Sequence, residues 1–237
     1  MVQMTPNTVV EDTLKTIYQL QREGDSPVAT SDIADRLEKT PPTVTSTLDR
    51  LETQGLIARE PYQGSELTDD GETVAIEVLR HHRLLETYLA DHLDYPWERV
   101  HEEADRLEHH ISERFERRLA ETLEHPRRDP HGDPIPTENL EPPDWDRTTP
   151  LSACEVGDRV VITRVRDRDE AELAYLADAG LTPGTTTRIL DIAPLGMVTL
   201  ETGDTEQAVP EAVATSIQVT VREGASDPES VDHRGGA

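Results

Sequence analysis

Cysteine, lysine and long apolar runs are nearly absent from this sequence. Cys154 is the only cysteine, which excludes an internal disulfide and a zinc site built from several cysteine thiolates. No stretch approaches the roughly 18 consecutive apolar residues of a membrane-spanning helix. The amino-terminal residues lack the basic segment and following apolar run of a signal peptide. These absences predict a soluble, cytoplasmic protein.

Positive charge is scarce as well, and lysine provides very little of it. The 49 acidic residues outnumber the 23 basic ones and give a formal net charge of -26, and only Lys15 and Lys39 are lysines. Blocks of like charge often indicate disorder, but here the acidic residues lie on the polar faces of segments with a helical period. This composition is typical of a folded protein in molar salt, which screens charges beyond about 3 Å. We therefore predict that the protein works in the cytoplasm of a halophile.

The amino-terminal residues show the pattern of a winged helix-turn-helix. Residues 8–23 have apolar side chains at helical spacing. Two shorter helices are predicted at 30–37 and 40–54, and the second has a proline in its first turn, where it removes no hydrogen bond. Residues 56–68 contain two short strands around a proline and glycine turn, which would form the wing. Such an arrangement usually binds DNA.

Candidate DNA contacts lie on the second of these short helices and at its start. Their hydroxyl groups and guanidinium suit phosphates and base edges. The same region carries several acidic residues, so release of counterions can contribute little to affinity. The affinity for DNA would have to come from base contacts, hydration and an added cation that relieves the repulsion between the acidic residues and DNA. The candidates, all predicted to be exposed, are Thr40, Pro42, Thr43, Thr45, Ser46, Thr47 and Arg50.

The stretch HEEADRLEHH, residues 101–110, crowds three histidines and four carboxylates into ten residues. We predict one helix from after Pro96 to about Glu124, in which a ligand-rich stripe covers about a third of the circumference. The stripe flanks an apolar face, and unpaired carboxylates at the edge of a core are costly unless a cation satisfies them. The stripe is His101, Asp105, Glu108 and His109, and the apolar face is Val100, Ala104, Leu107, Ile111 and Phe115.

Three further side chains complete a candidate metal site. His82 and Glu86 are four residues apart on a predicted helix over 69–93, and Asp12 projects from the first helix. Each alone would be an ordinary structural residue. Together with the stripe they offer nitrogen and oxygen ligands without sulfur, a set that favours Mn²⁺, Fe²⁺ or Co²⁺.

The second half of the chain has a different pattern. Seven prolines between residues 125 and 150 predict an irregular linker. Beyond it, apolar and polar residues alternate in four segments, with one short helix at 169–180, and this predicts a small β-barrel. Residues 223–237 have the composition of a disordered tail.

Motifs typical of enzymes are weak. HEEAD is similar to the zinc-hydrolase motif H-E-x-x-H, but Asp105 replaces the second histidine. The sequence has no nucleophile elbow, P-loop or dinucleotide fingerprint. We therefore predict a protein that is not an enzyme.

The order of these motifs resembles the diphtheria-toxin-repressor and manganese-transport-regulator family of metal-dependent transcription factors. The resemblance covers residues 8–137, and residues 151–222 resemble the SH3-like carboxyl-terminal domain of the iron-responsive branch. The segments that establish the first part are LKTIYQL, IADRLEKTPPTVTSTLDRLETQGLI, LTDDG, HHRLLETYLADHL, VHEEADRLEHHIS and GDPIP.

The resemblance implies two metal sites. The regulatory site would be Asp12, Asp105, Glu108 and His109; the ancillary site would be His82, Glu86 and His101, with Asp169 and Glu172 from the SH3-like domain. The carboxylates at the first two positions are similar to the manganese branch, since the iron branch typically has methionine and cysteine there. The manganese branch also has a carboxylate one turn after this aspartate, where this chain has Lys15.

We thus predict an α+β protein. Its domains would be a winged helix-turn-helix domain at 1–70, a helical metal-binding and dimerisation domain at 71–137, a proline-rich linker at 138–150, an SH3-like β-barrel at 151–222 and the tail at 223–237.

The resemblance also implies a homodimer that binds operator DNA when Mn²⁺ or Fe²⁺ is present and represses genes for metal uptake. A winged-helix regulator whose effector is not a metal is the alternative, in which the acidic and histidine stripe would be only a salt-adapted surface.

Overall fold

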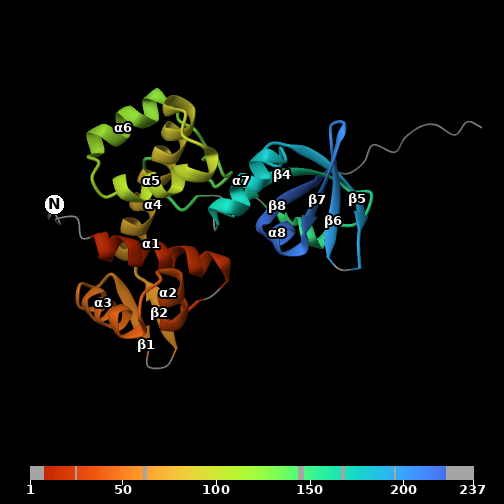
Figure 1. Ribbon diagram of the computed structural model, residues 1–237. Helices are drawn as coiled ribbons and strands as arrows, with labels where there is room; N and C mark the ends of the chain where they lie inside the picture. Colours follow the sequence, from red (N-terminus) through yellow and green to blue (C-terminus); the bar gives the residue numbers. More distant parts are fainter. Residues whose placement is uncertain are drawn as a thin grey trace, which may run out of the picture. The chain divides into compact units, whose positions relative to one another are not determined.

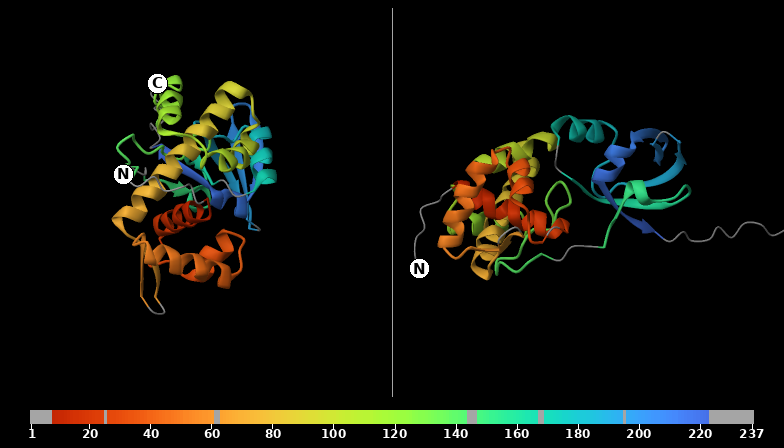
Figure 2. Two further views of the ribbon diagram at one scale, coloured as in Figure 1. Left: turned by 90° about the vertical axis from the view of Figure 1, so that its left-hand side faces the viewer. Right: turned by 90° about the horizontal axis from the view of Figure 1, so that it is seen from below.

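Helices form most of the first of two structural units, and a β-sheet forms the second, as predicted for an α+β protein (Figure 1, Figure 2). The computed structural model describes residues 8–24, 26–60, 63–143, 147–166, 169–194 and 196–222. The two compact units are residues 1–145 and 146–237. None of the helices in the described ranges combines the length and apolar character needed to cross a bilayer.

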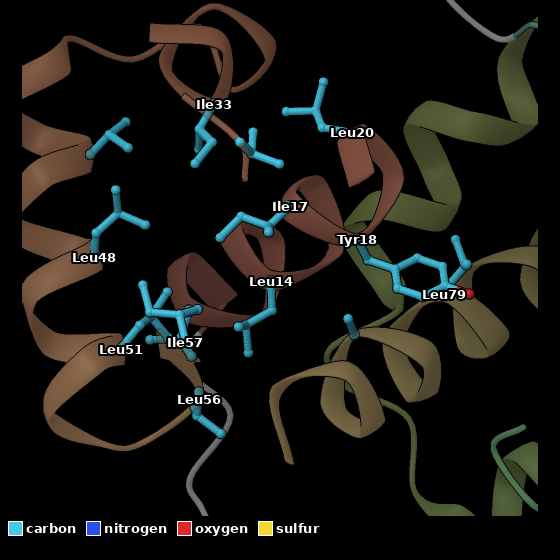
Figure 3. Close-up of a cluster of buried hydrophobic side chains, with 14 of the residues drawn as sticks. Leu14, Ile17, Tyr18, Leu20, Ile33, Leu48, Leu51, Leu56, Ile57 and Leu79 are labelled. Atoms are coloured by element: carbon cyan, nitrogen blue, oxygen red, sulfur yellow. The ribbon is translucent and has the colours of Figure 1, made fainter. Parts of the chain in front are cut away.

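The amino-terminal part of the first unit folds as the predicted winged helix-turn-helix. Its elements, with the long helix that follows, are α1 (Thr8–Glu23), α2 (Thr30–Arg36), α3 (Pro41–Thr53), β1 (Ile57–Glu60), β2 (Gly64–Leu67) and α4 (Asp69–Leu93). Helix α1 has apolar residues on two sides: Ile17 lies toward α2 and α3, whereas Tyr18 points toward Leu79 of α4 (Figure 3). Helix α1 therefore joins the helix-turn-helix to α4 through one hydrophobic core.

The wing is attached to the loop before α2 by a close backbone contact. Strands β1 and β2 are antiparallel, and a bridge pairs Val28 with Ser65 through two backbone hydrogen bonds of 3.0 and 2.9 Å. Gly64 has φ of 118°, and a Cβ there would lie 2.4 Å from the Val28 carbonyl oxygen. Only glycine fits this approach without moving the backbone.

Thr47, predicted to be exposed, is buried at 9% exposure. Its hydroxyl donates a hydrogen bond of 3.3 Å to the Thr43 carbonyl oxygen. The reason is helical geometry, since Thr47 lies three residues after the buried Val44 and four residues before the buried Leu51 on the same face of α3. The predicted exposure of Thr47 is therefore wrong.

The rest of the first unit packs around α4. Thr68 caps this helix, as its hydroxyl accepts a hydrogen bond from the Gly71 amide. A second hydrophobic cluster, which includes Leu84, Leu85, Val100 and Leu119, lies farther along α4. The other helices that contribute to it are α5 (Val100–Leu107), which follows the short helix η1 (Trp97–Arg99), and α6 (Glu113–Thr122).

The single helix predicted from after Pro96 to about Glu124 is instead two helices. Ser112 has an extended backbone, and its hydroxyl accepts a hydrogen bond from the Phe115 amide, so it begins α6. Serine favours such a cap over the interior of a helix. The predicted apolar face consequently does not continue: Val100 and Ala104 are buried, but Phe115 is 48% exposed.

The proline-rich segment has no helix or strand at residues 125–143 and 147–148, and only the two-residue strand β3 (Thr149–Pro150) at its end, yet residues 127–136 pack against the helices. Ile135 belongs to the second hydrophobic cluster. Arg83 donates a hydrogen bond of 2.5 Å to the Pro134 carbonyl oxygen, and Trp97 donates one of 2.9 Å to that of Pro130. This part of the predicted linker is thus a structural piece of the first unit.

The second unit contains the four predicted strands and the predicted short helix, but the sheet does not close into the predicted barrel. The strands are hydrogen-bonded in the order β3-β8-β4-β5-β6-β7, and within the described residues no ladder joins β3 to β7. Strand β3 is only two residues long and ends in proline, which has no amide to extend a ladder. The elements are β3 (Thr149–Pro150), η2 (Leu151–Ala153), β4 (Arg159–Val165), α7 (Glu170–Asp178), β5 (Thr186–Ile192), β6 (Met197–Thr202), β7 (Thr205–Pro210), α8 (Glu211–Ser216) and β8 (Ile217–Arg222).

Candidate metal centre

The candidate ligands of the first unit come from α1, α4, α5 and the turn that follows α5. Helix α1 packs on α4, and α4 packs on α5, so side chains from helices far apart in sequence meet (Figure 1). The seven ligands predicted in this unit fall into three groups that share residues, but Asp105 is grouped with His82 and Glu108 and not with Asp12 and His109, as the predicted regulatory site would require. The seven are Asp12, His82, Glu86, His101, Asp105, Glu108 and His109.

The first ligand group joins α1 to the turn after α5. Ligand atoms of Asp12, Glu108 and His109 lie within 4.8 Å of one another. The Nε2 atom of His109 is 2.8 Å from Asp12 Oδ1 and 3.2 Å from Glu108 Oε1. Its Nδ1 atom lies 2.5 Å from Oε2 of Glu11, a partner that the sequence did not suggest. Mixed imidazole and carboxylate donors suit Mn²⁺ or Fe²⁺.

His82 belongs to two further groups, one with Asp105 and Glu108 and one with Glu86 and His101. Its Nδ1 atom lies 2.7 Å from Glu108 Oε2 and 3.2 Å from Asp105 Oδ1. Its Nε2 atom lies 2.9 Å from Glu86 Oε1 and 3.0 Å from His101 Nδ1. One imidazole therefore faces a ligand group on each side.

The ammonium group of Lys15 lies inside the group formed by His82, Asp105 and Glu108. Its Nζ atom is 2.9 Å from Asp105 Oδ1, and it is 2.7 and 2.9 Å from the two oxygens of Glu108. Burial opposes the charged form, but the attraction of Glu108 and Asp105 outweighs it and raises the pKa of Lys15 above its usual value. Lys15 is therefore a buried cation in direct contact with two of the candidate ligands.

Hydrogen bonds between histidines and carboxylates set the pKa values in this site. Burial disfavours the ionised form of Glu108, but hydrogen bonds from His109 and His82 lower its pKa to about 2. Burial disfavours the charged form of His109, but hydrogen bonds to Asp12 and Glu108 raise its pKa to about 11. A metal ion binds the neutral imidazole, so its binding must displace these protons.

A fourth ligand group was missed by the sequence reasoning. Glu86, Asp129 and His131 are all buried, with ligand atoms within 4.8 Å of one another. Asp129 Oδ1 accepts backbone hydrogen bonds of 2.9 Å from both His131 and Asp133, and burial with the nearby Glu86 carboxylate raises the pKa of Asp129 well above its usual value. The signal was the D-x-H spacing within DPHGDPIP, which was hidden in the predicted linker.

The remaining two predicted ligands lie in the second unit. Asp169 Oδ1 caps α7 by accepting a hydrogen bond of 2.9 Å from the Glu172 amide. Glu172 Oε1 accepts a hydrogen bond from the Ser216 hydroxyl. Each carboxylate has a second oxygen, so these local contacts leave the prediction of ligands at Asp169 and Glu172 untested.

Five of the seven predicted DNA contacts are exposed. Thr45 is half-buried, and its hydroxyl donates to the Pro41 carbonyl oxygen at 2.9 Å. On the wing, Arg59 lies 2.5 Å from Asp49 Oδ1, so a carboxylate of α3 already pairs with this cation. The exposed candidates are Thr40, Pro42, Thr43, Ser46 and Arg50.

Three families of protein domains match successive parts of the chain. Residues 7–65 match "Iron dependent repressor, N-terminal DNA binding domain", and residues 68–137 match "Iron dependent repressor, metal binding and dimerisation domain". Residues 149–221 match "FeoA domain". The first two ranges contain α1 to α6 and the four ligand groups.

Whole-chain similarity decides the family. The diphtheria toxin repressor of Corynebacterium efficiens is 37% identical over 187 residues, which are 75% of this chain and 81% of that repressor. The chain belongs to the diphtheria toxin repressor family. Another member, the iron-dependent repressor IdeR of Mycobacterium tuberculosis, is 45% identical over 133 residues. That match covers 55% of this chain and spans only 57% of the length of IdeR.

Solved structures of the family have the same fold. A protein described as "Manganese-dependent transcriptional repressor complex with manganese" superposes with a TM-score of 0.83. It is 32% identical in sequence, and the match covers 90% of this chain and 100% of that one.

Proposed function

We propose that this protein is a metal-dependent transcriptional repressor that binds operator DNA as a homodimer when Mn²⁺ or Fe²⁺ fills the regulatory site. The observation that supports it most directly is the meeting of Asp12 with Glu108 and His109. Asp12 lies on α1, which shares a hydrophobic core with the helix-turn-helix, whereas the other two follow α5.

The regulatory site couples metal to DNA through α1. A divalent cation supplies positive charge that lets the carboxylates of Asp12 and Glu108 approach each other without repulsion. Asp12 then holds α1, and with it α3, at one spacing from α5. The metal stabilises this arrangement only to the extent that it binds this conformation more tightly than the other conformations of the protein. Neutralising carboxylates in a chain of net charge -26 also favours approach to a polyanion.

The proposal extends to the ancillary site and to the target. His82, Glu86 and His101 would form that site with Asp169 and Glu172, and the target genes would be those of metal uptake. The donor set without sulfur supports Mn²⁺ or Fe²⁺. The relatives are named as repressors, which supports a non-catalytic protein that acts in the cytoplasm.

Replacement of Asp12 by Asn tests the coupling. The variant loses a charged ligand at nearly constant size, so we expect its Mn²⁺ affinity to fall at least about tenfold and its Mn²⁺-dependent DNA binding to fall with it. Calorimetry in molar KCl measures the first. Fluorescence anisotropy measures the second on a duplex selected from random DNA by the Mn²⁺-loaded protein.

Asp91→Asn is the matched control, because Asp91 is exposed on α4 and should leave both affinities unchanged. If Asp12→Asn keeps the full metal dependence of DNA binding, the coupling through α1 is wrong. If the unchanged protein binds DNA equally well with and without Mn²⁺ or Fe²⁺, a regulator with a non-metal effector is favoured.

A further inference from the structure

We infer that Lys15 acts as a built-in cation that occupies one of two adjacent cation positions, so that a single divalent ion completes the bridge between α1 and α5. The inference rests on the proposed function, since it assigns the metal to the group of Asp12, Glu108 and His109. It adds that the group of His82, Asp105 and Glu108 is already satisfied by the chain itself.

The contacts of Lys15 are those of a fully satisfied ammonium ion. An ammonium has three hydrogens to donate, and Nζ lies 2.7 to 2.9 Å from three carboxylate oxygens of Asp105 and Glu108. The residue is 8% exposed, so little water competes for these bonds. A buried lysine is stable only with such partners.

The same oxygens would be needed by a divalent ion beside His82. His82 Nδ1 faces Asp105 Oδ1 and Glu108 Oε2, and Lys15 contacts both of these atoms at 2.9 Å. An ion there would have to share two ligand oxygens with an ammonium of like charge. The group has the spacing of a metal site but contains a cation of its own.

Lys15 also links the same parts of the molecule as the proposed metal. It lies on α1, one turn after Asp12, and its partners are 90 and 93 residues farther along the chain. Metal-free protein therefore keeps this ionic connection in addition to the contacts of His109 with Glu11 and Asp12. The metal would take the place of the His109 proton between Asp12 and Glu108, rather than creating the contact between α1 and the end of α5 from nothing.

Replacement of Lys15 by Glu should open the second position. The variant places a carboxylate beside Asp105, Glu108 and His82, a set of oxygen and nitrogen donors suited to Mn²⁺. We expect it to bind one more Mn²⁺ per chain than the unchanged protein in equilibrium dialysis with elemental analysis. Lys39→Glu makes the same charge change at an exposed lysine and should leave the number of ions unchanged.

Lys15→Met gives a second measurement if the Glu variant does not fold. It leaves Asp105 and Glu108 without their cation, so we expect the metal-free protein to melt at least about 6 °C lower, while Lys39→Met melts as the unchanged protein. Added Mn²⁺ should raise the melting temperature of Lys15→Met more than that of the unchanged protein.

The outcomes separate this inference from the proposed function. Equal Mn²⁺ counts for a folded Lys15→Glu variant and the unchanged protein overturn the inference alone, as does an unchanged melting temperature of metal-free Lys15→Met. If the unchanged protein binds neither Mn²⁺ nor Fe²⁺, the proposed function fails, whereas the role of Lys15 in joining α1 to α5 is still decided by the metal-free melting temperatures.

Discussion

His82 connects the ligand groups because its two ring nitrogens face different carboxylates. Nδ1 faces Glu108 and Nε2 faces Glu86, at 2.7 and 2.9 Å. Burial alone would remove its proton, but attraction to Glu86 holds the pKa of His82 well above its usual value. In metal-free protein, His82 thus donates to both sides and keeps two buried carboxylates ionised.

The paired charges predict a stability optimum at mildly acidic pH for metal-free protein. His109 has a raised pKa of about 11, so its contribution is complete below its unfolded pKa of about 6.5 and is lost as the pH rises toward 11. Glu108 has a lowered pKa of about 2, so its contribution is complete above about 4.5 and is lost as the pH falls toward 2. Urea unfolding from pH 3 to 10 in molar KCl measures the free energy of unfolding.

His109→Gln is the variant that identifies the source of the alkaline decline. It should reduce the loss of stability between about pH 6.5 and 9, to which the raised pKa of His82 also contributes. Because His109 helps to lower the pKa of Glu108, the acidic decline should weaken as well. A profile as steep in His109→Gln as in the unchanged chain would assign the alkaline loss to other groups.

At the scale of secondary structure, the interruption between α5 and α6 matters most for the site. A continuous helix would have placed Glu108 and His109 on one stripe with His101. Instead α5 ends at Leu107, and the turn directs His109 toward α1, where Nε2 meets Asp12 at 2.8 Å. The serine cap of α6 is thus part of what positions the metal ligands.

Ser112→Ala should destabilise the protein through loss of this cap. The hydroxyl that accepts from the Phe115 amide is removed, and we expect the free energy of unfolding to fall by about 1 kcal/mol in urea titrations. Ser31→Ala is the control, since α2 begins without a side-chain cap, and its effect should be within about 0.5 kcal/mol. Equal losses in the two variants would argue against a capping role.

At the scale of the whole molecule, two compact units divide the predicted ligands. The four ligand groups of the described residues come from the first unit, whereas Asp169 and Glu172 begin α7 in the second. Each of these carboxylates uses one oxygen in a local hydrogen bond.

We predict that the full chain with Asp169→Asn and Glu172→Gln loses about tenfold in Mn²⁺ affinity at the ancillary site but keeps its regulatory site. Two calorimetric binding steps would distinguish these sites, and Asp191→Asn on the exposed part of β5 is the control. An unchanged titration would mean that the second unit contributes no ligand.

Local patterns determined much of this protein from the sequence alone. Periodicity predicted α1 to α4, the wing and the strands β4, β5, β6 and β8 of the second unit, although not β3 and β7, because the alternation of apolar residues depends only on near neighbours. The ligand types were also readable, and Asp12, His82 and the residues around Asp105 do come together.

Only the tertiary structure decided which groups share a site and where elements stop. In the folded protein, Thr47 lies on the buried face of α3, the sheet of the second unit is open, and Asp129 and His131 pack beside Glu86. The tertiary structure also placed the ammonium of Lys15 between two carboxylates some 90 residues away. The physical reason is that such contacts depend on how distant segments pack, and a pattern of near neighbours contains no information on that packing.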